Sequence, residues 1–426
     1  MEHGIWRTDL GAPLNFTTNA RITGPLTAEV LRAALPAVRA RHPHLRARIA
    51  TDAAGHPGFR HDEVPPLELT VVAGGDWVKE LEREINQPFA LQGPLARFTL
   101  VPTGPGEAYL LITIHHSVGD GMSGAFLMRD LLEACAQAIA GQTPRLAELA
   151  ASASIDEGLP PAGRGLRAWG HHLRFISREL SVALRSGRPL KVRRDQHHYA
   201  HSRRARVIPH QLDPVFAERL LTRARAEQTT VHGALSAAML LGTLADAQVE
   251  RAGVTFGTPV NVRALLAPAI AEQLGFYISM VSYRAVVDAK VPLWDLARAV
   301  RRQLEGTIAR GDQLSMLDLL PRLMGLLDSP GLEPKVLLER VERAAAATTG
   351  LTNLGRLTIA SQHGPLKIED CHFAACPSAL GDFMATATSL HGRIFWNFVW
   401  ADPVLTEAHA HSLVGGIVDR LKRAVA

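Results

Sequence analysis

The segment HHSVGDG at residues 115–121 holds the side chains most able to do chemistry in this 426-residue chain. A histidine near its reference pKa of about 6.5 can accept a proton from a hydroxyl or an amine at neutral pH. Two adjacent histidines, with Gly-Asp-Gly beginning three residues after the second, therefore predict general acid–base catalysis. The alternative is an ordinary strand end followed by an Asp-Gly turn, with histidines that only satisfy local hydrogen bonds. The complete seven-residue pattern disfavours that alternative.

The elements on either side of this segment fit a catalytic loop. Residues 95–101 and 108–114 predict a β-hairpin whose second, apolar strand is buried, and a helix is expected over 123–139. Loops at the carboxyl ends of strands commonly carry the sites of α/β proteins. Successive strand residues point to opposite faces, so only one of His115 and His116 can face a substrate. The other packs or forms a hydrogen bond behind it.

Helices and strands alternate through both halves of the chain, which predicts an α/β fold. Helices are expected over 26–41, 76–87, 214–227, 231–245, most of 293–347 and 406–424. Strands are expected over 204–212, 253–260, 356–361, 365–375, 383–389 and 393–400. Single cores stop growing near about 250–300 residues, so we expect two domains, residues 1–185 and 195–426.

Composition and targeting signals exclude several classes of protein. The chain is 47% hydrophobic and 20% charged with a net charge of +5, which is typical of neither disordered nor fibrous proteins. Three widely spaced cysteines, Cys135, Cys371 and Cys376, predict buried thiols in a reducing cytoplasm, not disulfides or a zinc site. No signal-peptide pattern and no run of about 18 apolar residues is found, so membrane contact is expected to be at most peripheral.

Other ligand-binding motifs are missing from the sequence. It has no P-loop, no GxGxxG after a strand, no HExxH and no GxSxG elbow. Basic residues are not interleaved with aromatic ones, so nucleic-acid binding is not expected. The basic run from Lys191 to Arg206 either contacts a carrier-protein helix or coenzyme A phosphates, or is a solvated face.

The HHxxxDG pattern resembles the signature of a known acyltransferase superfamily. That superfamily contains chloramphenicol acetyltransferase, the condensation domains of nonribosomal peptide synthetases, and the stand-alone polyketide-associated acyltransferases of mycobacteria. Further segments resemble it in order along most of the chain: RHPHLR at 41–46, NQPF at 86–89, GPLAR at 93–97, GTPVNVR at 257–263, LGFY at 274–277 and TNLGR at 352–356. The histidine motif is specific, and the other segments carry weight as an ordered set.

This resemblance implies a role for each residue of the motif. His116 would be the general base and His115 a structural residue. Asp120 would face away from the substrate and pair with an arginine, and Gly121 would keep the backbone close to the substrate. Three arginines remain open as the partner of Asp120: Arg41, Arg46 and Arg263.

The resemblance also suggests substrate-contacting residues. Ser117 and Gly119 lie inside the motif, and Asn353 is the best candidate from the second half to line the site. The alternative for Asn353 is a turn residue. No metal ligand is implied.

The fold and reaction follow from the same resemblance. It implies an α/β protein of two chloramphenicol-acetyltransferase-like domains with a tunnel between them. His116 would deprotonate an acceptor as it attacks an acyl thioester in a ternary complex. The donor would be acyl-coenzyme A or a phosphopantetheinyl acyl-carrier protein, with no bound cofactor. A monomer would be sufficient.

We therefore predict a stand-alone acyltransferase that transfers groups other than amino-acyl groups. It is expected to form an ester with an alcohol, in lipid or polyketide biosynthesis. One alternative is amide formation on an amine. Another is a catalytically silent module that binds carrier proteins.

Two departures from the family pattern bear on the site. The DFGWG segment of many condensation domains is missing, and the nearest stretch, GDF at 381–383, is not a real match. The turn that reads LGNF in the family reads LGFY at 274–277, so we expect a polar contact to be missing there.

Overall fold

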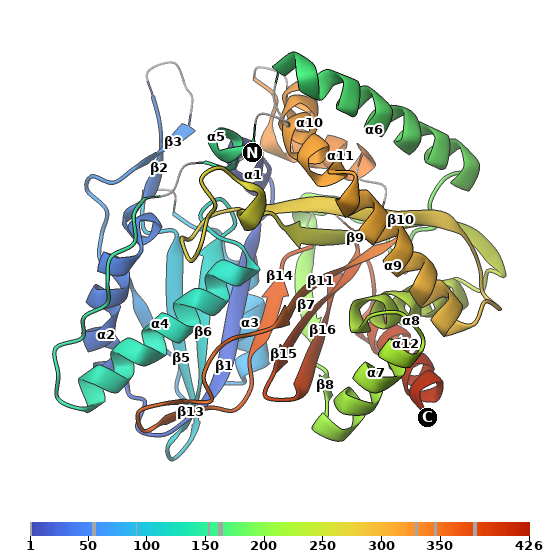
Figure 1. Cartoon of the computed structure of the whole chain (residues 1–426). Helices are drawn as coiled ribbons and strands as arrows, with labels where there is room; N and C mark the ends of the chain where they lie inside the picture. The colour runs from blue at the N-terminus through green and yellow to red at the C-terminus, as the bar shows by residue number, and fades with distance from the viewer. Residues whose placement is uncertain are drawn as a thin grey trace.

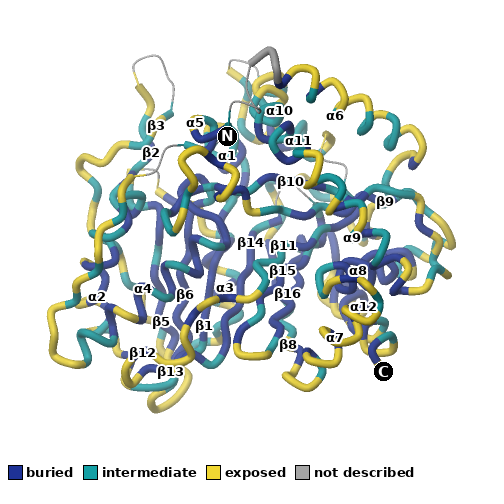
Figure 2. The backbone as a smooth tube through the Cα atoms, viewed as in Figure 1, coloured by how far each residue is buried: buried dark blue, intermediate teal, exposed yellow. Residues whose placement is uncertain are grey.

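The computed structural model describes residues 2–52, 57–90, 92–151, 154–160, 165–328, 331–344, 347–377 and 381–426. Two seven-stranded sheets lie side by side, each covered by helices (Figure 1). Their buried strands form the dark centre of Figure 2. The predicted α/β class with two similarly built halves is confirmed, and the tunnel between them stays a prediction.

The first sheet has the strand order β12-β13-β1-β6-β5-β4, with β14 paired to β1 beside β13. The pair β5 and β6 is the predicted hairpin. The strands of the first sheet are β1 (Asn15–Thr23), β4 (Leu69–Val71), β5 (Ala96–Gly104), β6 (Glu107–His115), β12 (Gln362–His363), β13 (Leu366–Ile368) and β14 (His372–Ala375).

The second sheet has the order β10-β9-β11-β15-β16-β7, with β8 also paired to β16. Its strands are β7 (Arg204–Ile208), β8 (Gln211–Leu212), β9 (Arg251–Asn261), β10 (Ile278–Asp288), β11 (Thr349–Arg356), β15 (Phe383–Leu390) and β16 (Arg393–Asp402). A separate two-stranded ribbon pairs β2 (Arg48–Thr51) with β3 (Pro57–Arg60).

Several helices begin at a residue whose side chain caps the first turn. Thr27 caps one helix of the first half and Thr230 one of the second, each accepting a backbone N–H. The helices of the first half are α1 (Glu2–Asp9), α2 (Ala28–Arg41), α3 (Trp77–Asn86), α4 (Gly121–Ile139), α5 (Ile155–Gly158) and α6 (Gly165–Ser186). Those of the second half are α7 (Pro214–Ala226), α8 (Val231–Asp246), α9 (Leu293–Ala309), α10 (Asp312–Leu327), α11 (Pro334–Ala344) and α12 (Glu407–Val425).

Alternate residues of β6 face two different cores. Leu110 and Ile112 pack with the cluster that contains α2 and α4, whereas Tyr109 and Leu111 pack with the cluster that contains α3. This alternation follows from the period of two along a strand. The first sheet is therefore covered on both faces, and its central strand carries the motif into the interior.

The two halves of the chain are interlocked through the first sheet. Strands β12, β13 and β14 come from residues 362–375 and add to the sheet that the N-terminal residues build. The division into domains 1–185 and 195–426 stays a prediction, with this segment of the second range crossing over to the first sheet.

Some predicted strands differ from the observed ones. The single strand expected over 365–375 is two strands, because β13 and β14 pair with β1 in registers offset by one residue. Asp370 lies in that offset and its carboxylate accepts the backbone N–H of Arg21. The strand expected over 356–361 was wrong, since β11 ends at Arg356 after Gly355 adopts a positive φ of 71°.

The close approach of β9 to the end of α6 gives a test of the fold. A Cβ on Gly253 would lie 2.0 Å from the carbonyl oxygen of Ser186, which belongs to backbone and cannot rotate away. We expect Gly253→Ala to lower the free energy of unfolding by about 1–3 kcal/mol in urea titration. Gly415→Ala is the matched control, since nothing lies within 4 Å of that site in α12, and it should raise stability by about 0.5–1 kcal/mol. Equal midpoints for the two variants would contradict this packing.

Candidate active site

The HHSVGDG segment lies between the end of β6 and the start of α4. His115 is the last residue of β6, and Asp120 is the N-cap of α4, accepting the backbone N–H of Ser123 at 2.9 Å. The helix thus begins two residues earlier than predicted. An aspartate at this position satisfies a helix N–H that would otherwise be unpaired.

His115 is a buried residue whose polar contacts, among the described residues, come from its own half of the chain. The backbone N–H of Ser117 donates to its Nδ1 at 3.2 Å, and the Ser117 hydroxyl lies 2.7 Å from the same atom. Its Nε2 lies 3.2 Å from a carboxylate oxygen of Asp9. Because Nδ1 accepts a hydrogen bond, the proton of neutral His115 is on Nε2, facing Asp9. These contacts support the structural role predicted for His115.

His116 is oriented by one hydrogen bond that determines its tautomer. Its Nδ1 lies 2.8 Å from the carbonyl oxygen of Gly119. A carbonyl oxygen only accepts, so Nδ1 must carry the proton that is donated. In neutral His116 the lone pair is therefore on Nε2, and no described residue hydrogen-bonds to that atom. A half-buried imidazole with an available Nε2 lone pair can act as a general base.

Two phenylalanines from different halves of the chain enclose the His116 ring. Phe16 of β1 lies 5.1 Å from it between ring centroids, and Phe276 of the second half lies 5.1 Å away, edge to face. Burial lowers the pKa of His116 below its usual 6.5, and the hydrogen bond to Gly119 only partly opposes this. His116 is therefore neutral at neutral pH, as a base must be.

Asp120 and Arg263 form an ion pair across the two halves. Two hydrogen bonds join them, at 2.6 and 2.9 Å, and Asp120 is fully buried. Asp120 also accepts from Ser123 and from the backbone N–H of Tyr277 at 3.1 Å. Burial alone would raise the pKa of Asp120, but the charge and hydrogen bonds of Arg263 hold it below its ordinary value.

The other two candidate arginines have different partners. Arg41 donates to Asp130 at 2.6 Å and to Glu272 at 2.7 Å, which gives a second contact between the halves. Arg46 lines an outer pocket of about 570 Å³ beside α2, together with Arg32 and Arg39. Of the three, Arg263 is therefore the residue that pairs with Asp120.

The two motif glycines are both in close contact. A Cβ on Gly121 would lie 2.5 Å from the side chain of Leu354 in β11, so Gly121 lets the second half approach the start of α4. A Cβ on Gly119 would lie 3.0 Å from Ile114. The predicted contact of Gly119 and Ser117 with substrate stays a prediction, as does the closeness of the Gly121 backbone to it. The Ser117 hydroxyl itself is buried and directed at His115.

Asn353 adopts the turn geometry that was the alternative for it. Its side-chain oxygen accepts the backbone N–H of Gly355 at 2.8 Å. The neighbouring Leu354, not Asn353, meets Gly121. Contact of Asn353 with a substrate also stays a prediction.

Sequence reasoning missed three residues that surround the motif. Phe16 and Asp9 carry no motif, and only the sheet pairing of β1 with β6 brings that segment to the histidines. Phe276 did have a signal, since it occupies the first of the two positions where LGFY departs from LGNF. The expected loss of a polar contact there corresponds to an aromatic contact on His116.

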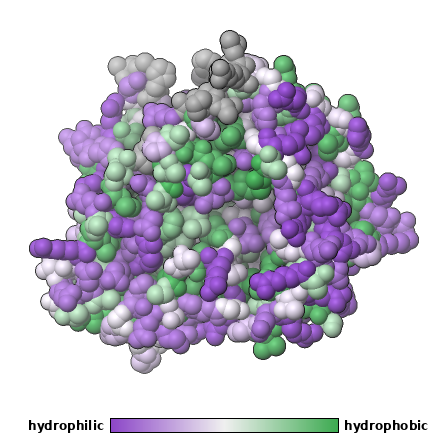
Figure 3. Space-filling model, in the orientation of Figure 1, coloured by the Kyte–Doolittle hydropathy of each residue, from purple (hydrophilic) through white to green (hydrophobic). Residues whose placement is uncertain are grey.

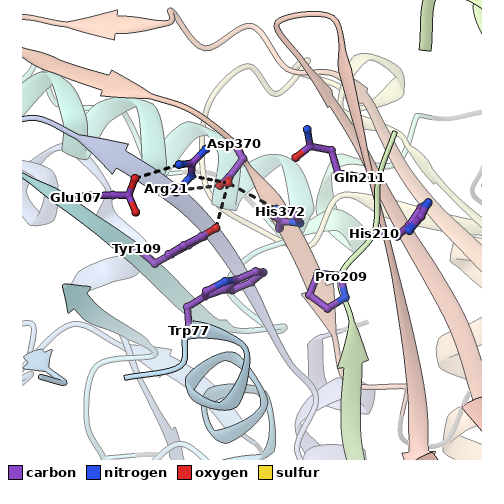
Figure 4. Close-up of a pocket in the computed structure, with 9 residues that line it drawn as sticks. All are labelled: Arg21, Trp77, Glu107, Tyr109, Pro209, His210, Gln211, Asp370 and His372. Atoms are coloured by element: carbon purple, nitrogen blue, oxygen red, sulfur yellow. Dashed lines mark hydrogen bonds and ion pairs between the residues drawn. The ribbon is translucent and has the colours of Figure 1, made fainter. Parts of the chain in front are cut away.

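A polar pocket of about 380 Å³ lies elsewhere, near the other end of β1 (Figure 4). Arg21 pairs there with Glu107 and Asp370, and Tyr109 donates to Asp370. The charges of Arg21, Glu107 and Asp370 thus satisfy one another in this pocket. No group of three or more His, Cys, Asp or Glu within the described ranges is arranged to hold a metal.

Two family models match the chain in succession. The model of the condensation domain matches residues 12–151. The model of the phthiocerol/phthiodiolone dimycocerosyl transferase C-terminus matches residues 201–393. The first match contains the histidine motif, and the second contains Arg263, Phe276 and Leu354.

Solved structures share the fold over nearly the whole chain. Polyketide synthase associated protein 5 from Mycobacterium tuberculosis is 17% identical with a TM-score of 0.71, covering 100% of this chain and 96% of its own. The first condensation domain of the calcium-dependent antibiotic synthetase, in complex with a substrate analogue, is 19% identical with a TM-score of 0.73, covering 100% and 95%. The TRI3 trichothecene 15-O-acetyltransferase from Fusarium sporotrichioides is 13% identical with a TM-score of 0.72, covering 99% and 93%.

Curated relatives are much longer proteins. A probable non-canonical nonribosomal peptide synthetase, CymA, from Salinispora arenicola is 29% identical over 80% of this chain, which spans 4% of its length. Phosphinothricin tripeptide synthetase PhsC from Streptomyces viridochromogenes is 26% identical over 73% of this chain and 29% of its own length. The similarity thus concerns one portion of each synthetase.

The buried ion pair gives a test of how the site is held together. We expect Arg263→Met to lower the free energy of unfolding by about 3–5 kcal/mol in urea titration, because Asp120 would stay buried without its partner. The exposed pair of Arg301 and Glu305 is the matched control, and Arg301→Met should cost at most about 1 kcal/mol. The double variant Asp120→Asn with Arg263→Met should recover part of the loss. A cost for Arg263→Met no greater than for Arg301→Met would refute the assignment.

Proposed function

This chain belongs to the HHxxxDG acyltransferase superfamily of condensation domains and polyketide-associated acyltransferases, and on that premise we propose that it transfers an acyl group from a thioester to an alcohol. The donor is acyl-coenzyme A or an acyl-carrier protein. His116 is the general base, and the product is an ester.

The reaction balances without any further reactant. His116 Nε2 takes the hydroxyl proton as the alcohol oxygen bonds to the thioester carbonyl carbon. The tetrahedral intermediate then collapses, the carbon–sulfur bond breaks, and the proton passes from His116 to the leaving thiolate. An ester and a free thiol result. No covalent acyl-enzyme is needed.

The observation that carries this proposal is the hydrogen bond from His116 Nδ1 to the Gly119 carbonyl oxygen at 2.8 Å. It leaves the base lone pair on Nε2, away from the backbone. The Gly119 carbonyl also stabilises the imidazolium that forms when Nε2 is protonated. One contact therefore supports both states of the base.

The start of α4 supports stabilisation of the oxyanion. The first turn begins at Gly121, five residues after His116, and the positive end of the helix dipole favours negative charge there. The side chain of Asp120 caps the Ser123 N–H, so the N–H groups of Gly121 and Met122 are the first-turn donors left for a ligand. We propose that one of them binds the developing oxyanion.

The surroundings of His116 favour a neutral acceptor over an ammonium. An ammonium held in the site would call for an available carboxylate. The carboxylate of the motif, Asp120, already accepts hydrogen bonds from Arg263, Ser123 and Tyr277. The rings on either side of His116 are apolar. These features support ester formation on an apolar alcohol as the first candidate.

Replacement of the base tests the proposed reaction. Purified protein would be given a panel of acyl-coenzyme A and acyl-carrier donors with alcohol or amine acceptors, and thiol release would be measured. We expect acceptor-dependent release with alcohols and a fall in kcat of about 10²- to 10⁴-fold in His116→Ala. His411→Ala, an exposed histidine of α12, is the matched control and should keep full activity.

Each result of this assay has a definite meaning. Full activity in folded His116→Ala would disprove the mechanism. Release with amines alone would indicate amide formation instead. No release with any donor would favour a silent module that binds carrier proteins.

The lowered pKa of His116 predicts the pH dependence. Since burial depresses this pKa, kcat/KM should be constant near neutral pH and fall tenfold per pH unit only below a kinetic pKa that is itself below 6.5. Phe276→Ala should raise this kinetic pKa toward 6.5 by admitting water beside the ring. The measurement is kcat/KM between pH 5 and 8. A kinetic pKa above 7 in the unmodified protein would contradict the burial of His116.

A further inference from the structure

Helix α6 carries an exposed apolar stripe along one side. Trp169, Leu173, Ile176, Leu180 and Leu184 recur every three or four residues, so they lie on one face. Leu173 and Leu180 are each 60% exposed and Leu184 is 84% exposed. Five large apolar side chains exposed together on one helix are unusual on a protein surface, where they normally occur singly.

The inward side of the same helix is already satisfied. His172 hydrogen-bonds to Ser315 and Asp318 of α10, and Arg178 pairs with Asp312. These contacts fix α6 against α10 and leave the apolar stripe outside. The side of α6 that packs on the rest of the described chain is therefore a different side from the apolar stripe.

The charges on and after α6 are almost all positive. Glu179 is the single acidic residue of the helix, and it faces inward toward Arg284 at 3.9 Å. Arg174, Arg185, Arg188 and Lys191 are exposed, and none of them forms an ion pair with any residue that the structure describes. In Figure 3, hydrophobic and hydrophilic side chains alternate along the upper right edge, where Figure 1 places α6. The surface thus offers apolar contact together with unpaired positive charge.

The shape of this surface distinguishes between possible occupants. α6 stands on the outside of the molecule as a single convex ridge, about 33 Å long for 22 residues (Figure 1). A second copy of this chain would bring an equally basic helix against it. A helical protein partner would be expected to use a groove between elements, whereas a convex amphipathic helix can embed its apolar side in a lipid interface. The described helices include none long and apolar enough to cross a membrane.

We propose that α6 binds the surface of a membrane rich in anionic lipids, with the stripe from Trp169 to Leu184 entering the interface and the unpaired Arg and Lys side chains meeting the headgroups. Tryptophan suits the headgroup level, and each basic side chain adds electrostatic attraction to anionic lipid. This inference does not depend on the proposed reaction. It would place the protein beside apolar acceptors.

Vesicle sedimentation with the full chain tests this surface. The probes are vesicles of pure phosphatidylcholine and vesicles of phosphatidylcholine with about 30% phosphatidylglycerol, each at low and at high salt. We expect binding to the anionic vesicles that is at least about tenfold stronger than to the neutral ones and that weakens with salt. Leu173→Ser with Leu180→Ser should weaken binding by at least about tenfold, and so should Arg174→Glu with Arg185→Glu.

A matched double variant separates this effect from general surface hydrophobicity. Val215 and Leu221 are exposed apolar residues of α7, away from α6, and Val215→Ser with Leu221→Ser should leave vesicle binding unchanged. Thermal unfolding of all variants would show that each is folded.

Three results would overturn the proposal. One is the same weak binding to anionic and neutral vesicles. Another is equal loss of binding in the α6 and α7 double variants. The third is evidence that the stripe binds a protein instead. In that case the α6 leucine variant would abolish dimerisation in light scattering, or capture of an acidic acyl-carrier protein, and vesicle binding would be unaffected.

Discussion

The Arg263 guanidinium donates two hydrogen bonds to the Asp120 carboxylate in the interior of the molecule, where both groups are buried. Removing two charges from water is costly unless the pair has good geometry and gains further hydrogen bonds. Here Ser123 and the backbone of Tyr277 complete the shell of Asp120, and the Arg263 guanidinium lies over the Tyr277 ring. The pair therefore requires one relative position of β6, α4 and the turn before β10.

That requirement places His116. Asp120 caps α4, and the short loop from His115 to α4 is closed by the hydrogen bond of His116 to Gly119. The same turn that supplies Tyr277 also supplies Phe276 to the His116 ring. Gly275, with a φ of 155° and no room for a Cβ beside Tyr277, permits the turn. Thus Tyr277, which donates to Asp120 of the ion pair, and Phe276, whose ring helps to bury His116, are adjacent in sequence.

The halves are held together by more than one kind of contact. Strands β12–β14 give the first sheet part of its backbone pairing from the second half, and the Arg41, Arg129 and Glu272 cluster adds ion pairs. Domains within a chain normally move relative to each other unless their interface is extensive. Shared sheet and buried charge both oppose such motion here. The outer helix α6 lies apart from these contacts, which leaves its exposed side available for a surface.

The sequence by itself determined the α/β class, the hairpin of β5 and β6, most helices, and the histidine motif, in which His116 is the predicted base. These features depend on local patterns: apolar periodicity, capping residues and residues adjacent in the chain. It left open which arginine pairs with Asp120, and it could not place Phe16, Asp9 or Leu354 near the motif. It also merged β13 and β14 into one strand. Those features depend on contacts between residues far apart in sequence, such as Arg263 with Asp120 and Asp370 with Arg21. Only packing of the whole chain decides such contacts. Several residues of the same type, such as the three candidate arginines, could pair with one partner, and the tertiary structure brings just one of them to it.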